Sequence, residues 1–161
     1  MARKVFFSFH HKGDIGRVGQ IRNSGLTRGV TDAGFVDEAD WESIKRKGDS
    51  AVKSWIDVQL NGTSVTVVLI GSETSTRPWV NYEIRESHKK GNGIIGIYIH
   101  NVKDFRNNNF SIKGKNPLSN INYKDSYRTL ADEYPVYDWV NDNGYQNLGY
   151  WVETAAKKAG R

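Results

Sequence analysis

The apolar run VTVVLI at residues 65–70 is followed within a few residues by a helix-start sequence, and this pair constrains the fold more than any other feature. A nearly continuous apolar run is typical of a strand that is covered on both faces of a parallel sheet. Ser75, Thr76 and Pro78 favour the start of a helix. The pair therefore predicts one strand–helix unit of an α/β sheet.

The same alternation of strand-like and helix-like segments extends along the chain up to residue 99. Strands are predicted at 5–9, 34–37, 65–70 and 94–99. Helices are predicted from near Asp14, from Asp49 as a capping residue, and from about Thr76 to near Gly91. This order predicts an α/β fold with a mostly parallel sheet, right-handed crossovers and helices on both faces.

The remaining segments are predicted to be less regular. Residues 38–48 predict an irregular loop, and residues 101–124, rich in Asn and Lys, predict a long surface loop. A loop of that length is uncommon and often functional. Residues 135–140 predict a short edge strand, where proline is tolerated. Residues 145–158 predict a last helix with one apolar face.

Composition limits the class of protein. At 161 residues, the chain 1–161 is predicted to be one domain with its core at about 3–100 and a strand and helix in 135–161. The absence of cysteine excludes disulfides and thiolate chemistry. No apolar run reaches the roughly 20 residues of a membrane span or forms a signal peptide, so we expect no membrane association and a cytoplasmic protein. The net charge of +5 suits an anionic partner, but the spread of the Lys and Arg residues does not favour nucleic acid.

Glu83 is the first candidate functional residue. On the helix predicted after residue 76, Val80 and Ile84 form the buried stripe, and Glu83 lies about 100° around the helix from them. This position predicts a carboxylate at the rim of the packed face, above the carboxyl edge of the sheet, where open α/β proteins keep their ligand crevice. A solvated helical glutamate is the alternative.

Several other chemistries find no support. Gly13, Gly16 and Gly19 have GxxGxxG spacing, which matches neither a dinucleotide fingerprint nor a P-loop. The chain lacks a Gly-x-Ser-x-Gly elbow and the acidic residues of a phospho-receiver. The four histidines are His10, His11, His88 and His100, and no third ligand is evident for any pair of them. No metal site is therefore predicted.

Five segments in order carry a resemblance to a known family. They are VFFSFHHKGD, GFVDEADW, a helix led by Gly48 and Asp49, SVTVVLIGSETS and WVNYEI, the last being the most specific. Together they resemble the TIR and TIR-like domains, and more closely the TIR-like proteins of the bacterial Thoeris anti-phage system. The resemblance covers about residues 3–100 and implies a flavodoxin-like (TIR-like) arrangement of the sheet.

The resemblance also implies a site and an activity. It implies that Glu83 is the catalytic residue for cleaving NAD, which is then a substrate and not a cofactor. It implies that the loop after the first strand, with Phe9, His10 and His11, lines the nucleotide pocket. It also implies that Asp37 and Trp41 contribute from the loop after the second strand. Many enzymatic TIR domains have basic residues where this chain has His10 and His11.

One further aromatic residue is a candidate ligand contact. Trp79 or Trp41 is predicted either to stack on a ring of the nucleotide or to belong to the core. The resemblance further implies a cyclic ADP-ribose isomer as product, an effector protein that senses it, and homo-oligomers through TIR surfaces.

The reaction fits a lone carboxylate. Nicotinamide is already a cationic leaving group, so positive charge develops on the ribose, as in glycoside cleavage. Stabilising that charge needs one acidic side chain and no partner acid. Two other readings stay open: a TIR-like interaction module in which Glu83 is merely solvated, and a basic nucleic-acid or nucleotide-binding regulator.

Overall fold

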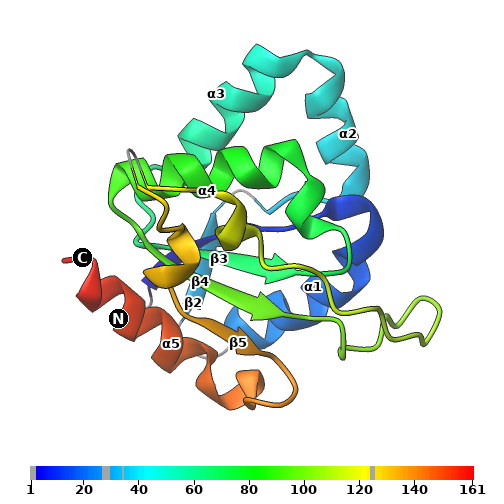
Figure 1. The fold of residues 1–161 in the computed structure, drawn as a ribbon. Helices are drawn as coiled ribbons and strands as arrows, with labels where there is room; N and C mark the ends of the chain where they lie inside the picture. Colours follow the sequence, from blue (N-terminus) through cyan, green and yellow to red (C-terminus); the bar gives the residue numbers. More distant parts are fainter. Residues whose placement is uncertain (1–2, 27–29, 34, 124–125) are drawn as a thin grey trace.

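The protein is built on one five-stranded sheet in which every neighbouring pair of strands is parallel (Figure 1). The computed structural model describes residues 3–26, 30–33, 35–123 and 126–161. The strands are β1 (Arg3–Ser8), β2 (Val30–Ala33), β3 (Val65–Ile70), β4 (Gly93–Tyr98) and β5 (Val136–Asp138). Their order is β2-β1-β3-β4-β5, which is the flavodoxin-like order. The predicted α/β fold is confirmed.

Helices cover both faces of this sheet (Figure 1). They are α1 (His11–Leu26), α2 (Glu38–Arg46), α3 (Asp49–Leu60), α4 (Pro78–Lys90) and α5 (Gly144–Lys158), with three 3-10 turns, η1 (Thr74–Thr76), η2 (Pro117–Asn120) and η3 (Leu130–Asp132). On one face, α1 and α5 pack on β1, β3 and β4 in a single core cluster. On the other face, α3 and α4 bury a second and a third cluster. Among the described residues no helix is both long and apolar enough to cross a membrane.

The apolar run at residues 65–70 forms β3, the central strand of the sheet. All six residues of β3, Val65–Ile70, are buried, because β1 and β4 flank the strand and helices cover both its faces. The prediction for this strand is confirmed. The predictions for β4, β5 and α5 are also confirmed, with bounds that differ by one or a few residues.

The second strand and the segment after it were predicted wrongly. The strand is Val30–Ala33, which pairs with β1 through Arg3 opposite Val30, and residues 35–37 are not in a strand. Residue 34 of the predicted strand lies outside the described residues. β2 is an edge strand, and its two central residues, Thr31 and Asp32, are polar. The sequence of this strand therefore shows only a weak apolar pattern. Residues 38–48 are not an irregular loop, since most of them form α2, which begins after Asp37.

Two helix starts also differ from the prediction. α1 begins at His11, so Asp14 is not its capping residue but lies in its first turn. α3 begins at Asp49, and the capping position belongs to Gly48. Gly48 has a φ of 102°, a backbone conformation that glycine adopts at little cost. Both differences move the start of a helix by a few residues without changing the order of elements.

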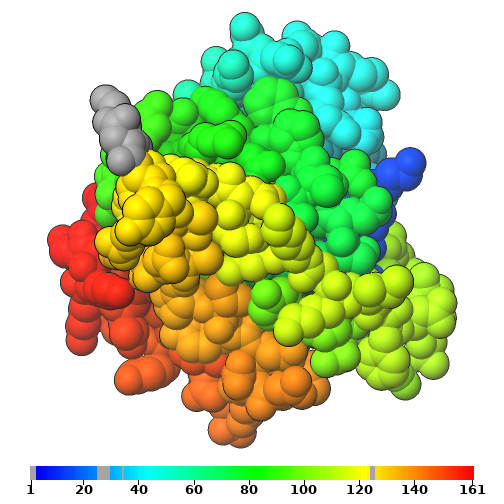
Figure 2. Space-filling model, in the orientation of Figure 1, coloured from blue at the N-terminus to red at the C-terminus, as the bar shows by residue number. Residues whose placement is uncertain are grey.

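The segment 101–124 is only partly the surface loop that was predicted. In its first half, residues 105–110 are exposed and Phe105, Phe110 and Ile112 are each at least 60% accessible, whereas Val102 and Asp104 are buried. Its second half is packed, because Leu118 and Ile121 are buried in one core cluster with β3 and α4. In Figure 2, yellow residues of this segment fill the surface between green α4 and the orange region of β5. Leu118 and Ile121 therefore pack this part of the segment against the core, although most residues around them are polar.

We expect Gly93→Ala to destabilise the protein by about 1–3 kcal/mol, the usual cost of overpacking. A Cβ at Gly93 would lie 2.5 Å from the backbone oxygen of Ala155, because α5 packs directly on the first residue of β4. The control is Gly19→Ala in α1, where a Cβ meets nothing within 4 Å and alanine is the better helix former. Urea unfolding measures both, and equal stability of the two variants would contradict the close approach of α5.

Candidate active site

Glu83 lies in the middle of α4, the helix that follows the central strand. Pro78 starts this helix at a position that needs no backbone N–H, and Gly91 ends it in the left-handed conformation, with a φ of 86°. Val80 and Ile84 are buried, as predicted. Glu83 itself is only 4% exposed, so the prediction of a carboxylate at the rim is wrong. The helix α4 packs closely on the sheet, including β1. The sheet therefore covers Glu83 as well as the apolar stripe of Val80 and Ile84.

The partner of Glu83 is Ser8, the last residue of β1. The Ser8 hydroxyl donates a hydrogen bond of 2.6 Å to Oε1 of Glu83, and Ser8 is fully buried. Because β1 ends at Ser8, the contact lies at the carboxyl edge of the sheet, where a ligand crevice was expected. Sequence reasoning missed Ser8, and a polar residue ending an apolar strand is the one signal that marks it.

Burial changes the protonation of Glu83. It raises the pKa of this carboxyl group from 4.5 to about 8, and only the Ser8 hydrogen bond acts in the opposite direction. The carboxyl group is therefore mostly protonated at neutral pH in this conformation. Acids with strongly shifted pKa values are frequent at functional sites.

Three of the predicted ligand contacts form an aromatic stack next to β1. The ring of His11 lies between those of Phe9 and Trp41, with centroid distances of 4.1 and 4.7 Å. All three residues are buried, and burial lowers the pKa of His11 to about 3, so its ring is neutral. Both faces of this imidazole are occupied. The structure thus brings Phe9, His11 and Trp41 together, but as a packed wall and not as an open stacking platform.

His10 is the half-exposed member of the same loop. Its Nε2 lies 3.9 Å from a carboxylate oxygen of Glu73, which precedes η1. Burial, followed by the positive charge of Arg77, lowers the pKa of His10. The ring is therefore mostly uncharged at neutral pH, and its contact with Glu73 is not an ion pair. Through Glu73 and Arg77, His10 touches the connection that leads from β3 into α4.

The two remaining predicted contacts have local structural roles. Asp37 is exposed and caps α2, since its side chain accepts a hydrogen bond from the backbone N–H of Asp40 at 2.8 Å. Trp79 is half-buried, packs against the cluster that contains Trp41, and meets the ring of Tyr82 edge-on at 5.8 Å. Trp79 therefore packs on the core next to the site. The side chain of Asp37 is used as the N-cap of α2.

Asp14 is a second buried acid at this edge that sequence reasoning missed. It is 3% exposed, its Oδ2 makes no hydrogen bond within the described residues, and Arg17 lies 3.7 Å from its Oδ1. Burial raises the pKa of Asp14 to about 6, although Arg17 favours the ionised form. Asp14 packs against Gly71, directly after β3, where a Cβ would collide with its carboxylate. The glycine lets this acid approach the β3–α4 connection.

No metal centre is evident. Within the described part of the chain, no three His, Asp or Glu side chains gather closely enough to hold a metal ion. The described residues at this edge include the buried Glu83–Ser8 pair and the aromatic stack of Phe9, His11 and Trp41.

The fold and the site define an α/β protein of the flavodoxin-like class with a buried acid, Glu83, on the helix that follows its central strand. Residues 6–104 match the family described as the Thoeris protein ThsB, TIR-like domain. The chain belongs to this family. It is also 38% identical to a protein of Bacillus cereus (strain MSX-D12), over 192 aligned positions that cover 94% of this chain and 100% of that protein. That relative is named as the proposed cyclic ADP-D-ribose synthase ThsB1.

Proposed function

We propose that this protein cleaves the nicotinamide–ribose bond of NAD and closes the remaining ADP-ribose into a cyclic isomer, with Glu83 as the catalytic carboxylate. The observation that carries the proposal is the hydrogen-bonded pair of Glu83 and Ser8 at the carboxyl edge of the sheet. Family membership and the name of the Bacillus cereus relative support the substrate and the product. In the cell, the product acts on a separate effector that senses it, and the reaction takes place in the cytoplasm, where NAD is available.

The raised pKa of Glu83 fits this reaction when the substrate itself is considered. The nicotinamide ring of NAD carries a positive charge, and a nearby cation favours the ionised form of a carboxyl group. Substrate binding is therefore expected to remove the proton that burial holds on Glu83. The carboxylate then stabilises the charge that develops at the ribose, a contribution of about 3–4 kcal/mol for one well-placed group.

The bonds and charges balance without a metal or a second acid. The C–N bond to the ribose breaks, and its electron pair leaves with nicotinamide, which becomes neutral. The cationic ribose carbon is captured by a nucleophile of the same molecule, which then loses a proton. Intramolecular capture prevails over water when the pocket holds that nucleophile close to the reacting carbon.

The closed position of Glu83 implies that the site must open before NAD reaches it, since 4% exposure leaves no room for a ribose. A trigger or a neighbouring copy of the chain is proposed to supply that opening. The more accessible parts of this region are Glu73, whose side chain is 60% exposed, and His10, whose side chain is 13% exposed. The neutral wall of Phe9, His11 and Trp41 then serves as a fixed support beside the nucleotide.

The product of the triggered reaction tests the proposal. We expect mass spectrometry to show nicotinamide together with a nucleotide that is one water lighter than ADP-ribose. The matched control is the Glu83→Gln protein treated with the same trigger, which should form neither product. ADP-ribose with nicotinamide, and no lighter species, would instead identify a plain NAD hydrolase. Intact NAD under all triggering conditions would favour the interaction-module reading.

A further inference from the structure

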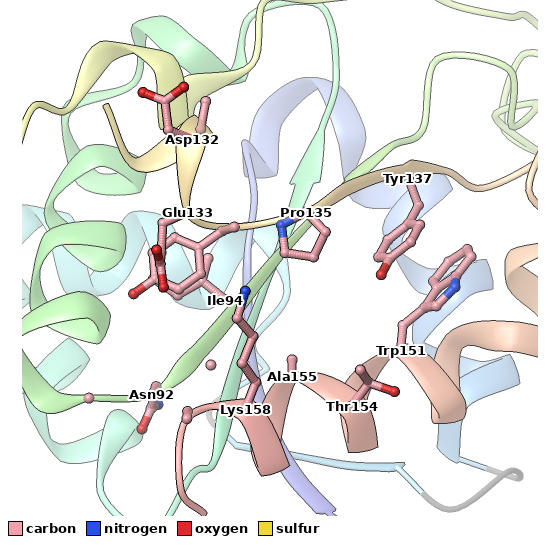
Figure 3. A pocket seen from close by; sticks show the side chains of 15 residues that line it. Asn92, Ile94, Asp132, Glu133, Pro135, Tyr137, Trp151, Thr154, Ala155 and Lys158 are labelled. Atoms are coloured by element: carbon pink, nitrogen blue, oxygen red, sulfur yellow. The ribbon is translucent and has the colours of Figure 1, made fainter. Parts of the chain in front are cut away.

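A cavity of about 500 Å³ opens at the edge of the sheet opposite Ser8 and Glu83 (Figure 3). It lies between the turn from α4 to β4, the segment 131–135 and the C-terminal half of α5. Ser8 ends its strand whereas Gly93 starts one, so in a parallel sheet the two positions face opposite edges. Sites for small molecules have volumes of about 300–1,000 Å³. This cavity therefore has the size of a ligand site but is not the candidate active site.

The walls of the cavity are flat, apolar and fixed by the core. The ring of Trp151 is stacked on that of Tyr137, with 4.1 Å between centroids and 4° between planes. Ile94 is buried at the start of β4, and Tyr134 and Pro135 complete the apolar lining. A ligand at this position meets surfaces that already have one conformation, which lowers the cost of binding. Flat walls of this kind favour a planar ring.

One cation has no partner inside this cavity. Lys158 makes no ion pair or hydrogen bond within the described part of the chain, and Figure 3 shows its side chain running from α5 toward Ile94. Figure 3 also shows the hydroxyl of Tyr137 directed toward the cavity, and this hydroxyl makes no hydrogen bond with described residues. An ammonium group that extends into the cavity without a partner provides an anchor for an anion.

The two acids of the lining are occupied elsewhere. The carboxylate of Asp132 accepts a hydrogen bond of 2.9 Å from the backbone N–H of Thr129, at the start of η3. Glu133 interacts with the hydroxyl of Tyr123, whose pKa is raised by burial and then by this carboxylate. The last turn of α4 adds Lys90 close to the same edge, whereas Lys89 pairs with Glu86 at 3.3 Å. Among the charged residues of the lining, Lys158 is therefore the one without a hydrogen-bond or ion-pair partner in the described part of the chain.

We propose that this cavity binds a small planar aromatic molecule that carries one anionic group, with the ring against Ile94, Pro135 and Trp151 and the anion on Lys158. The hydroxyl of Tyr137 donates a second hydrogen bond to the anion. Such a ligand also contacts the α4–β4 turn at Gly91 and Asn92, at the far end of the helix that carries Glu83. This site does not depend on the proposed reaction, because no step of NAD cleavage takes place there.

The probe is 1-anilinonaphthalene-8-sulfonate, an aromatic monoanion whose fluorescence rises in apolar surroundings. We expect saturable one-site binding to the full chain without NAD, and at least a tenfold higher Kd for Lys158→Gln. The matched control is Lys157→Gln on the same helix, because Lys157 is outside the lining and lies 3.8 Å from Glu153. Its Kd should equal that of the wild type. Thermal unfolding of each variant confirms that the fold is retained.

Two further measurements locate the probe and define its chemistry. Thr154 is an exposed residue of the lining, so Thr154→Trp should fill the cavity without disturbing the core and should abolish saturable binding. The uncharged analogue N-phenyl-1-naphthylamine should bind at least tenfold more weakly than the sulfonate. Binding that survives Thr154→Trp, equal affinity for the uncharged analogue, or equal loss in Lys157→Gln and Lys158→Gln would each overturn the proposal. Nicotinamide release tests the proposed function separately.

Discussion

Glu83→Gln is expected to lower the rate of NAD cleavage by at least about 100-fold, while the protein keeps its fold. Removing one group that stabilises developing charge usually costs a factor of about 100–1,000 in rate. Glutamine has nearly the same shape as glutamate and can still accept the hydrogen bond from Ser8 through its amide oxygen. The amide cannot carry the negative charge of a carboxylate. Nicotinamide release, measured under triggering conditions for the wild type and the variant, gives the ratio directly.

Glu86→Gln is the control for this result. Glu86 lies one turn further along α4, is half-buried and pairs with Lys89 at 3.3 Å across the helix surface. Its loss removes a carboxylate from the same helix without touching the Ser8 pair. We expect the rate of Glu86→Gln to stay within about twofold of the wild type. Near-wild-type turnover of Glu83→Gln would show that another group carries the reaction.

The same substitution is expected to have a second large effect, on the pH dependence of stability. The carboxyl group of Glu83 has a pKa of about 8 in the folded protein and an ordinary value of 4.5, because burial disfavours its charged form. Between these two values the folded state holds a proton that the unfolded state has released. The free energy of unfolding therefore falls as pH rises from about 4.5 to 8 and is constant above that range.

The size of this loss is at most about 5 kcal/mol, since one pKa unit corresponds to about 1.4 kcal/mol. Glu83→Gln has no proton to lose at this position. We therefore expect the variant to gain stability relative to the wild type as the pH is raised, and to exceed it near pH 8–9. Urea unfolding of both proteins at several pH values between 5 and 9 measures the difference. Parallel curves would mean that Glu83 is ionised in the folded protein.

Comparison with the variant is necessary because other groups titrate in the same range. Asp14, with a pKa raised to about 6 by burial, destabilises the fold in the same direction as pH rises above its ordinary value. His11, with a pKa lowered to about 3 by burial, acts below pH 6.5, where the unfolded state binds a proton and the folded state does not. Both contributions are common to the two proteins and cancel in the difference.

We propose that the burial and protonation of Glu83 in the resting protein restrain its activity. In this proposal, Glu83 is uncharged until the cationic substrate is next to it, and it is covered until the site opens. Both conditions must be met before NAD is consumed. Burial of the catalytic group thus reduces the stability of the fold at neutral pH, and the same burial is proposed to keep the enzyme inactive.

The site could be predicted only in part, and the reason differs between residues. Glu83 followed from its helix and from the family resemblance, both of which are local in sequence. Phe9, His11 and Trp41 were predicted as contacts, and the structure places them together, but only their stacking showed that they form a closed wall. Ser8 could not be identified as a partner, because it lies 75 residues from Glu83 along the chain.

The alternation of β3, α4 and β4 could be predicted from the sequence alone. The apolar run of β3 specifies a strand covered on both faces, and Pro78 and Gly91 mark the ends of α4, because these signals act through neighbouring residues. The edge strand β2 escaped prediction because an edge strand with polar central residues leaves little pattern. Residues 117–121 escaped for a similar reason, since two apolar side chains among polar ones leave no periodicity.

The burial of Glu83, its protonation and the cavity at the opposite edge became evident from the folded structure and not from the sequence. Each of these depends on how closely separate elements pack: α4 on β1 for the carboxyl group, and α5 on β4 for the cavity. The helical period of the sequence shows to which side of the helix a side chain points. It does not show how far the neighbouring elements extend over that side chain. The exposure of a side chain at the margin of a packed face is therefore set by contacts between residues distant in sequence.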